Sequence, residues 1–271
     1  MHFLLRPLQW IYCIYALLLF IGIMLLLFPF ILIASLFGNV TGGNMIYRLC
    51  MLWGDIWFPL IFIFHRNYYE QPLDKNKQYI FVGNHISYLD APLIVKTLRQ
   101  PIRALGKTEM SKVPVFGFIY KYAVVRVDRT SADNRAKSVR NMRSILKKGI
   151  SILVFPEGTF NMTPDPLKDF YDGAFRVAID AQMPIKPFLL LDMYDRLNYK
   201  SVFSLTPGKS RAIFLEEIPV EGLTQHDLPL LKQKVYDLMD KKLREYKASW
   251  IKTSDVKREI KKYEYNIHTH T

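Results

Sequence analysis

The hydrophobic positions of this chain are concentrated at its N-terminal end. No charged side chain occurs from Pro7 to Tyr47, and residues 10–28 are almost wholly apolar. A helix needs about 20 apolar residues to cross a bilayer, whereas the apolar part of a secretory signal has about 7 to 15 and precedes a small-residue cleavage site. This run is longer and no such site is evident, so the pattern predicts a membrane helix rather than a signal peptide.

A second apolar segment, residues 45–64, follows a turn rich in glycine and asparagine at residues 38–44. Pro29 is expected to bend or end the first helix, because its ring removes a backbone hydrogen bond. The second segment contains Arg48 and Asp55 and is therefore the weaker candidate for crossing a membrane. The pattern predicts two apolar helices joined by a turn, which either span the bilayer or lie in one leaflet. A buried hairpin of a soluble protein is the alternative.

Beyond residue 64 the pattern becomes that of a globular domain, in which short β-rich runs alternate with helical patterns. Apolar residues recur at helical spacing over residues 136–146, and residues 227–250 predict a basic amphipathic helix. The β-rich runs are residues 79–83, 102–105, 123–127, 151–155, 185–191 and 211–215. Such alternation predicts an α/β fold with a mixed, largely parallel sheet flanked by helices. We therefore expect a two-helix membrane-attachment element at residues 1–66 and an α/β domain at residues 67–271.

The charge of the chain is strongly positive: 37 Lys and Arg stand against 24 Asp and Glu, a formal net charge of +13. This excess favours acidic partners such as nucleic acid, anionic lipid headgroups or phosphate-bearing substrates. The sequence contains no recognisable nucleic-acid-binding module, so we expect membrane lipids and no nucleic acid. Cys13 and Cys50 lie in apolar segments and the six histidines have no metal-ligand spacing, so we expect no metal site.

Polar residues follow the strand predicted at residues 79–83, in the segment Gly83-Asn84-His85-Ile86-Ser87-Tyr88-Leu89-Asp90. Histidine can accept a proton from a hydroxyl near neutral pH, and a carboxylate on its other nitrogen fixes the tautomer. His85 and Asp90 are five residues apart, so they meet only if His85 lies in the turn and Asp90 opens the next helix. Pro92 suits a first helical turn. A helix-capping Asp90 and a structural His85 are the alternatives.

Two further regions carry polar residues at predicted strand ends. Glu157, with Gly158 and Thr159, follows the strand predicted at residues 151–155, and its carboxylate would either orient a substrate hydroxyl or bind backbone amides of the loop. Cations that can hold a phosphate lie at or near two other strand ends, at Lys107, Arg126 and Arg129.

In this order these blocks resemble the lysophosphatidic acid acyltransferases (1-acylglycerol-3-phosphate acyltransferases) of the glycerolipid acyltransferase superfamily. The resemblance covers about residues 79–191, and the N-terminal apolar pair looks like the membrane-attachment element of that family. Residues 84–90 match the first motif, a His and an Asp separated by four residues; residues 106–110, 114–117 and 127–129 are similar to the second, residues 155–159 match the third, and residues 184–187 look like the fourth.

The resemblance implies that His85, oriented by Asp90, removes the proton from a lysolipid hydroxyl, which then attacks the thioester of acyl-CoA or acyl-carrier protein. It implies no covalent acyl-enzyme and no cofactor beyond that cosubstrate. Lys107, Arg126 and Arg129 would bind the acceptor together with residues 157–159. The product would be phosphatidic acid, made at the cell inner membrane by an active site facing the cytoplasm.

The chain departs from the family pattern at two places. Phe160 follows Thr159 where the family usually has an arginine, and Tyr171-Asp172 precedes Gly173 where the family often has lysines. Both changes remove positive charge where a phosphate would bind. Either other cations compensate, or the acceptor is a different lysolipid, such as a lysophospholipid or an aminoacyl lipid. A non-catalytic lipid-binding protein of the same fold is a further alternative, although His85 and Asp90 are both present.

Overall fold

A computed structural model describes residues 2–74, 76–127 and 132–251. Seven strands of the described residues form one sheet in the order β1-β7-β6-β2-β5-β3-β4. Only the β6–β7 pair is antiparallel. The strands are β1 (Ile63–Tyr69), β2 (Ile80–Gly83), β3 (Ile102–Lys107), β4 (Val124–Val127), β5 (Ser151–Val154), β6 (Ile185–Leu190) and β7 (Gly208–Phe214). The predicted mixed, largely parallel sheet is confirmed.

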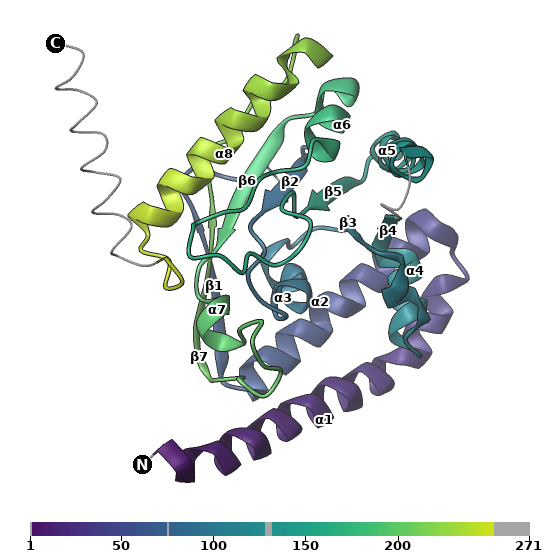
Figure 1. Ribbon diagram of the computed structural model, residues 1–271. Helices are drawn as coiled ribbons and strands as arrows, with labels where there is room; N and C mark the ends of the chain where they lie inside the picture. The colour runs from purple at the N-terminus through teal and green to yellow at the C-terminus, as the bar shows by residue number, and fades with distance from the viewer. Residues whose placement is uncertain (1, 75, 128–131, 252–271) are drawn as a thin grey trace, which may run out of the picture.

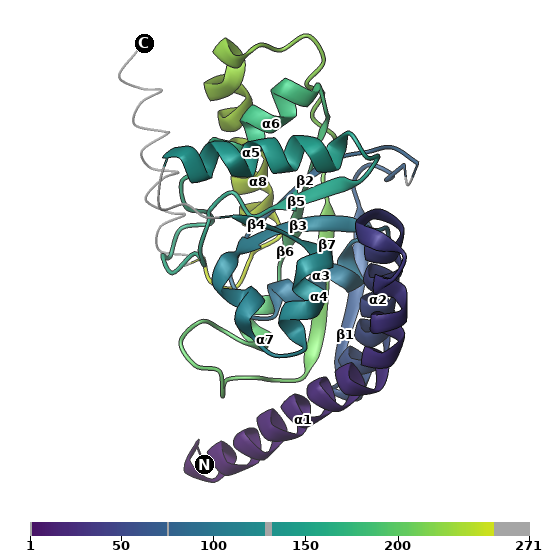
Figure 2. The same ribbon diagram turned by 90° about the vertical axis from the view of Figure 1, so that its right-hand side faces the viewer.

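Helices cover both faces of this sheet (Figures 1 and 2). Helices α5, α6 and α8 pack on one face and α2, α3 and α4 on the other, with α1 lying against α2. The bounds are α1 (His2–Ser35), α2 (Gly43–Leu60), α3 (Asp90–Thr97), α4 (Phe116–Ala123), α5 (Ala132–Leu146), α6 (Gly173–Ala181), α7 (Met193–Arg196) and α8 (Leu228–Glu245). The helices predicted at residues 136–146 and 227–250 correspond to α5 and α8, although α8 ends five residues earlier than predicted.

The middle of the sheet is buried on both faces, which explains why its strands are continuous apolar runs. Every residue of β2, β5 and β6 is buried. A parallel sheet covered by helices on both sides selects for such runs rather than for alternating patterns. Because β2 lies between β5 and β6, the turn after β2 leaves the sheet near its centre.

The edge strand β1 was not predicted from the sequence. Its residues read Ile-Phe-His-Arg-Asn-Tyr-Tyr, and only Ile63 is fully buried. Since β1 has a single strand neighbour, β7, its polar side chains reach solvent and the continuous apolar signal is lost. The expected boundary between residues 66 and 67 falls inside this strand, so the α/β unit begins at Ile63.

The predicted two-helix element is confirmed in part. Helix α1 does not end at Pro29 but continues to Ser35, curving along its length (Figure 2). Long apolar helices tolerate an internal proline more readily than helices in water do. Among the described residues, only the span 6–35 of α1 is long and apolar enough to cross a membrane, and 17% of its most apolar stretch is buried in the protein.

Helix α2 joins α1 to the α/β domain. Trp53 and Trp57 of α2 pack edge-on against Phe20 of α1, with ring centroids 4.6 and 5.2 Å away. The indole of Trp57 also donates a hydrogen bond of 2.9 Å to the carbonyl of Ala16. The opposite side of α2 packs on α3, α4 and β1. Helix α2 therefore packs between the apolar helix α1 and the α/β domain.

A buried arginine ties the α1–α2 turn to the sheet. Arg103 of β3 is 3% exposed. Its guanidinium donates to the carbonyl of Asn39 (3.0 Å) and to Oδ1 of Asn44 (3.1 Å). Gly43 faces the same guanidinium, which a Cβ at that position would approach to 2.4 Å. The predicted turn at residues 38–44 is therefore held by a contact with a residue about 60 positions further along the chain.

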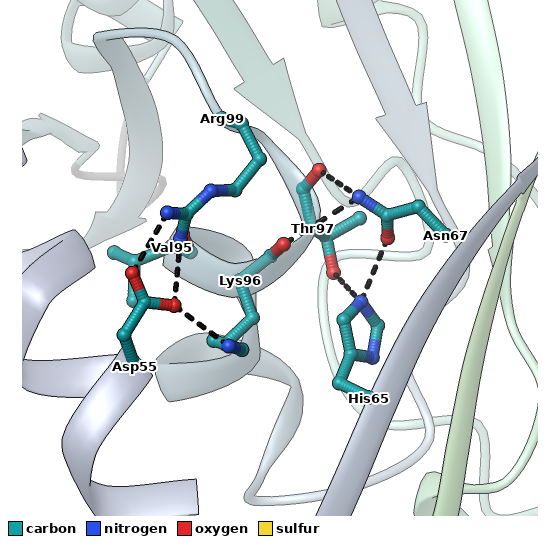
Figure 3. A network of polar contacts seen from close by, with 7 residues as sticks. All are labelled: Asp55, His65, Asn67, Val95, Lys96, Thr97 and Arg99. Carbon is teal, nitrogen blue, oxygen red and sulfur yellow. Dashed lines mark hydrogen bonds and ion pairs between the residues drawn. The ribbon is translucent and has the colours of Figure 1, made fainter.

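A polar network fastens the C-terminal end of α3 to α2 and β1 (Figure 3). Asp55 of α2 accepts bonds from Lys96 (2.6 Å) and Arg99 (2.8 Å). Asn67 of β1 donates to the carbonyl of Thr97 (2.8 Å), and its Oδ1 lies 2.7 Å from Nε2 of His65. These contacts fix the position of the helix whose first residue is Asp90.

His65 in this network is held neutral. Its Nδ1 lies 2.8 Å from the hydroxyl of Ser210, its partner in the β1–β7 ladder, and Nε2 faces the amide oxygen of Asn67. One nitrogen can therefore accept while the other donates, which is the pattern of neutral imidazole. The pKa of His65 is lowered from 6.5 to about 4, mainly by burial, with the positive charges of Lys96 and Arg99 acting in the same direction and the bond to Asn67 opposing them.

This lowered pKa predicts a stability loss in acid. A histidine whose folded pKa is depressed contributes its full stability above the unfolded value of 6.5 and loses it as pH falls towards 4. Taken over that range, the loss is about 3 kcal/mol. The free energy of unfolding is measured with denaturant for wild type and His65→Gln at pH 7 and at pH 4. We expect wild type to lose about 3 kcal/mol more than His65→Gln between the two pH values. Equal pH dependence in both proteins would contradict it.

Candidate active site

The turn after β2 is anchored to the neighbouring strand β6. The side chain of Asn84 donates to the carbonyl of Leu190 (3.1 Å) and accepts from the amide of Leu190 (2.7 Å). Gly83 precedes it where a Cβ would come within 2.6 Å of the ring of Phe188, so only glycine fits without a shift of that ring. Asn84 is 1% exposed. The turn therefore starts from a defined point at the carboxyl edge of the sheet.

His85 and Asp90 meet in the geometry that their spacing requires. His85 lies in the turn, Asp90 is the first residue of α3, and Nδ1 of His85 is 2.8 Å from Oδ2 of Asp90. The same oxygen accepts the backbone N–H groups of Ile86 (2.7 Å) and Ser87 (2.8 Å), and Asp90 is fully buried. Since Nδ1 donates to the carboxylate, Nε2 has the free lone pair and can accept a proton from a substrate hydroxyl.

Aromatic rings enclose the His85 imidazole. Phe155 stacks on it with ring centroids 4.5 Å apart at 15°, and Phe160 approaches edge-on at 4.4 Å. Tyr88 contacts Phe160 in turn, at 4.8 Å. The His85 side chain keeps 19% of its surface exposed. Phe160, which replaces the arginine of the family pattern, is therefore a wall of the imidazole site.

Glu157 is a loop carboxylate bonded to backbone amides, one of the two interpretations left open by the sequence. Its Oε1 accepts the N–H of His85 (2.8 Å) and its Oε2 accepts the N–H of Lys168 (2.9 Å). The residue is 1% exposed, and the pKa of Glu157 is raised to about 7. Burial is the main cause and the negative charge of Asp90 acts in the same direction, while the two N–H groups oppose them.

The hydroxyl of Thr159 contacts Lys168, a residue that was not predicted from the sequence to belong to the site. Nζ of Lys168 donates to Oγ1 of Thr159 across 2.8 Å. Gly158, directly before Thr159, has φ of +74°, a conformation that glycine adopts without strain. The contact forms only because the loop of residues 157–168 folds back on itself. It could therefore not be predicted from a local sequence pattern.

Lys107 and Arg126, two of the cations predicted to bind substrate, lie two and three strands away from β2, the strand that precedes His85. Lys107 ends β3, which is separated from β2 by β5, and Arg126 lies on β4 beyond it. In the ladder Lys107 aligns with Val127, one residue after Arg126, so the two side chains point to opposite faces of the sheet. Among the described residues neither bonds to the His85 turn. Arg129 lies outside the described residues.

Residues 65–190 match the family model described as Acyltransferase. An uncharacterised acyltransferase of Schizosaccharomyces pombe is 34% identical over 165 residues, which cover 59% of this chain and 58% of the relative. The 1-acyl-sn-glycerol-3-phosphate acyltransferase of Haemophilus influenzae is 27% identical over 77% of this chain and 85% of its own length. Over residues 65–190 the chain is thus similar to acyltransferases.

The likeness extends to a solved structure. The fold is similar to that of the 1-acyl-sn-glycerophosphate (LPA) acyltransferase PlsC from Thermotoga maritima, with a TM-score of 0.71 over 93% of this chain and all of that chain, at 22% identity. The His85–Asp90 pair lies inside the matched residues 65–190. Within the part of the chain that the structure describes, no group of three or more His, Cys, Asp or Glu side chains is placed to hold a metal ion.

The contacts of Glu157 predict how its loss would act. In Glu157→Gln the amide nitrogen faces one of the two backbone N–H groups, so either His85 or Lys168 loses its acceptor. We expect kcat to fall by about tenfold or more while KM for the acceptor changes little, because the residue positions His85 and does not touch substrate. Steady-state kinetics of wild type and Glu157→Gln, with thermal unfolding as a folding control, measure this. A raised KM with unchanged kcat would instead indicate direct substrate binding.

Proposed function

We propose that this protein transfers a fatty acyl group from a thioester, acyl-CoA or acyl-carrier protein, to the free hydroxyl of 1-acylglycerol-3-phosphate, giving phosphatidic acid. The observation that carries the proposal is the 2.8 Å contact between Nδ1 of His85 and the buried carboxylate of Asp90, which leaves Nε2 as a proton acceptor. The acceptor is suggested by relatives named 1-acyl-sn-glycerol-3-phosphate acyltransferases, of which the human alpha enzyme is 30% identical over 59% of this chain.

The reaction follows from the geometry of the pair. Nε2 of His85 takes the proton of the acceptor hydroxyl as its oxygen attacks the thioester carbonyl, and Asp90 stabilises the imidazolium that forms. The new oxygen–carbon bond replaces the carbon–sulfur bond, and the proton passes from His85 to the departing thiolate. Phe155 and Phe160 cover much of the ring and reduce its contact with water, which limits hydrolysis of the thioester.

Membrane attachment is part of the proposal. The apolar helix α1 leaves large side chains exposed, with Leu8 at 63%, Leu18 at 65% and Leu26 at 74%. Removing such surface from water favours a lipid environment. The net charge of +13 suits an anionic lipid surface, such as the cytoplasmic leaflet of a cell inner membrane. Both substrates of the proposed reaction carry acyl chains.

The contact between Phe160 and His85 supports an alternative class of acceptor. Phe160 packs 4.4 Å from the His85 ring, where the family pattern has an arginine. This removes a cation beside the reacting group. A lysolipid with a neutral or zwitterionic headgroup, such as a lysophospholipid or an aminoacyl lipid, is therefore the alternative acceptor.

An acceptor panel tests the proposed reaction. We expect 1-acylglycerol-3-phosphate to be among the acceptors with the highest kcat/KM when the purified protein is given one labelled acyl thioester and a set of lysolipids. Each acceptor is compared at the same micelle or vesicle composition. If lysophospholipids or aminoacyl lipids outrank it by tenfold or more, the alternative acceptor class is correct.

Substitution of the pair tests the chemistry. His85→Ala removes the proton acceptor, and we expect kcat to fall by about 10² to 10⁴ while lipid and thioester binding persist. Asp90→Asn is expected to be severely impaired as well, because an amide has no negative charge to stabilise the imidazolium and its NH2 group, facing Nδ1 of His85, would favour the wrong ring tautomer. Turnover comparable to wild type in His85→Ala would rule out this mechanism.

A further inference from the structure

Lys168 is tied to His85 through one buried carboxylate. The backbone N–H of Lys168 donates to Oε2 of Glu157, while the backbone N–H of His85 donates to Oε1 of the same side chain. Glu157 is 1% exposed, so the link is shielded from water. The backbone of Lys168 is therefore held next to the His85 turn, although 83 positions separate the two residues in the sequence.

The loop that carries Lys168 is braced by further contacts. The amide of Asn161 donates to the carbonyl of His85 (2.7 Å), and its side chain donates to the carbonyl of Asp165 (2.7 Å). The amide of Tyr171 donates to the carbonyl of Pro156 (2.9 Å), which closes the loop at its base. Asn161 is buried, with 1% of its surface exposed. A side chain on this loop consequently starts from a fixed position relative to His85.

The ammonium of Lys168 is available to an anion. It donates to Oγ1 of Thr159 (2.8 Å), and among the described residues no carboxylate lies within ion-pair distance of it. An ammonium has three donors, so two remain after the bond to Thr159. Asp172, the acidic residue that replaces a family lysine, is paired with Lys232 at 2.7 Å. The negative charge introduced at Asp172 is thus offset by Lys232 rather than by Lys168.

We propose that Lys168 and the hydroxyl of Thr159 bind the phosphate of the acceptor lysolipid, supplying the cation that the chain lacks at Phe160. The inference rests on the proposed acyl transfer to 1-acylglycerol-3-phosphate. In that acceptor four bonds join the reacting hydroxyl oxygen to phosphorus, so the phosphate lies within about 5 Å of that oxygen by ordinary bond lengths. A phosphate near His85 is therefore also near the loop that carries Lys168, and ammonium–phosphate bonds are charge-assisted.

Kinetics of three variants test this assignment. Lys168→Met keeps the backbone N–H that binds Glu157 and removes the ammonium, with both its charge and its bond to Thr159, and Lys168→Arg restores a cation. Lys148→Met is the matched control, because this exposed lysine follows α5 at the amino edge of the sheet, just before β5. We expect Lys168→Met to lower kcat/KM for 1-oleoylglycerol-3-phosphate by about 10- to 100-fold, mainly through KM, as for a lost bond to a charged group. Lys168→Arg should retain most of the activity and Lys148→Met all of it.

The acyl donor provides a second arm, because coenzyme A also carries phosphates. The loss in Lys168→Met should persist when acyl-CoA is replaced by the acyl thioester of N-acetylcysteamine, which has no phosphate. A loss that disappears with this donor, or a rise in KM for acyl-CoA alone, would assign the ammonium to the donor and overturn the proposal.

Direct binding separates this inference from the proposed function. In a His85→Ala background, Lys168→Met should weaken binding of 1-oleoylglycerol-3-phosphate in calorimetry and leave binding of 1-oleoylglycerol unchanged. If wild type fails to acylate the phosphate acceptor while its binding still depends on Lys168, the proposed function fails and the phosphate site stands. Binding that is equal with and without the Lys168 charge would overturn the phosphate site whatever the activity.

Discussion

The buried carboxylate of Asp90 is the constraint on which the site depends. One of its oxygens accepts three N–H groups, from the ring of His85 and from the backbone of Ile86 and Ser87. A fully buried charge needs such hydrogen-bond donors, and the turn of residues 85–87 supplies them. Because Nδ1 of His85 donates to the carboxylate, the proton of the neutral ring lies on Nδ1. Asp90 is the first residue of α3, and the far end of that helix is fixed by Asp55 and Asn67. The orientation of His85 is thus set by a whole helix rather than by one hydrogen bond.

A second buried carboxylate holds His85 from the other side. Asp90 binds the ring nitrogen and Glu157 binds the backbone nitrogen of the same residue, and the two acids come from the connections after β2 and after β5. Bringing both acids to one histidine is costly, because burial and the charge of Asp90 raise the pKa of Glu157 to about 7. Such shifted groups are typical of functional sites, where local stability is exchanged for a fixed geometry.

The apolar helix α1 is connected to the site through the segment after α7. Ser87, beside His85, donates its hydroxyl to the carbonyl of Leu197. Further along, Phe203 lies 5.9 Å from Trp10 of α1, and Leu205 accepts from Gln9 at 3.4 Å. At the other end of α1, Arg103 holds the α1–α2 turn against the sheet. The two ends of the hydrophobic helix are therefore both fastened to the α/β domain, which suits chemistry on a substrate that resides in lipid.

The sequence alone determined the local features of this protein. The buried strands were recognisable because a covered parallel sheet requires unbroken apolar runs, and the His85–Asp90 geometry because a five-residue spacing with Pro92 permits only a turn followed by a helix start. The features that depend on contacts between residues distant in the chain were decided only by the tertiary structure. The edge strand β1 lacks an apolar signature, α1 continues through Pro29, and Glu157 and Lys168 acquire their roles when one loop closes on the His85 turn. Periodicity reports which face of an element is buried, whereas partners across a fold are set by packing.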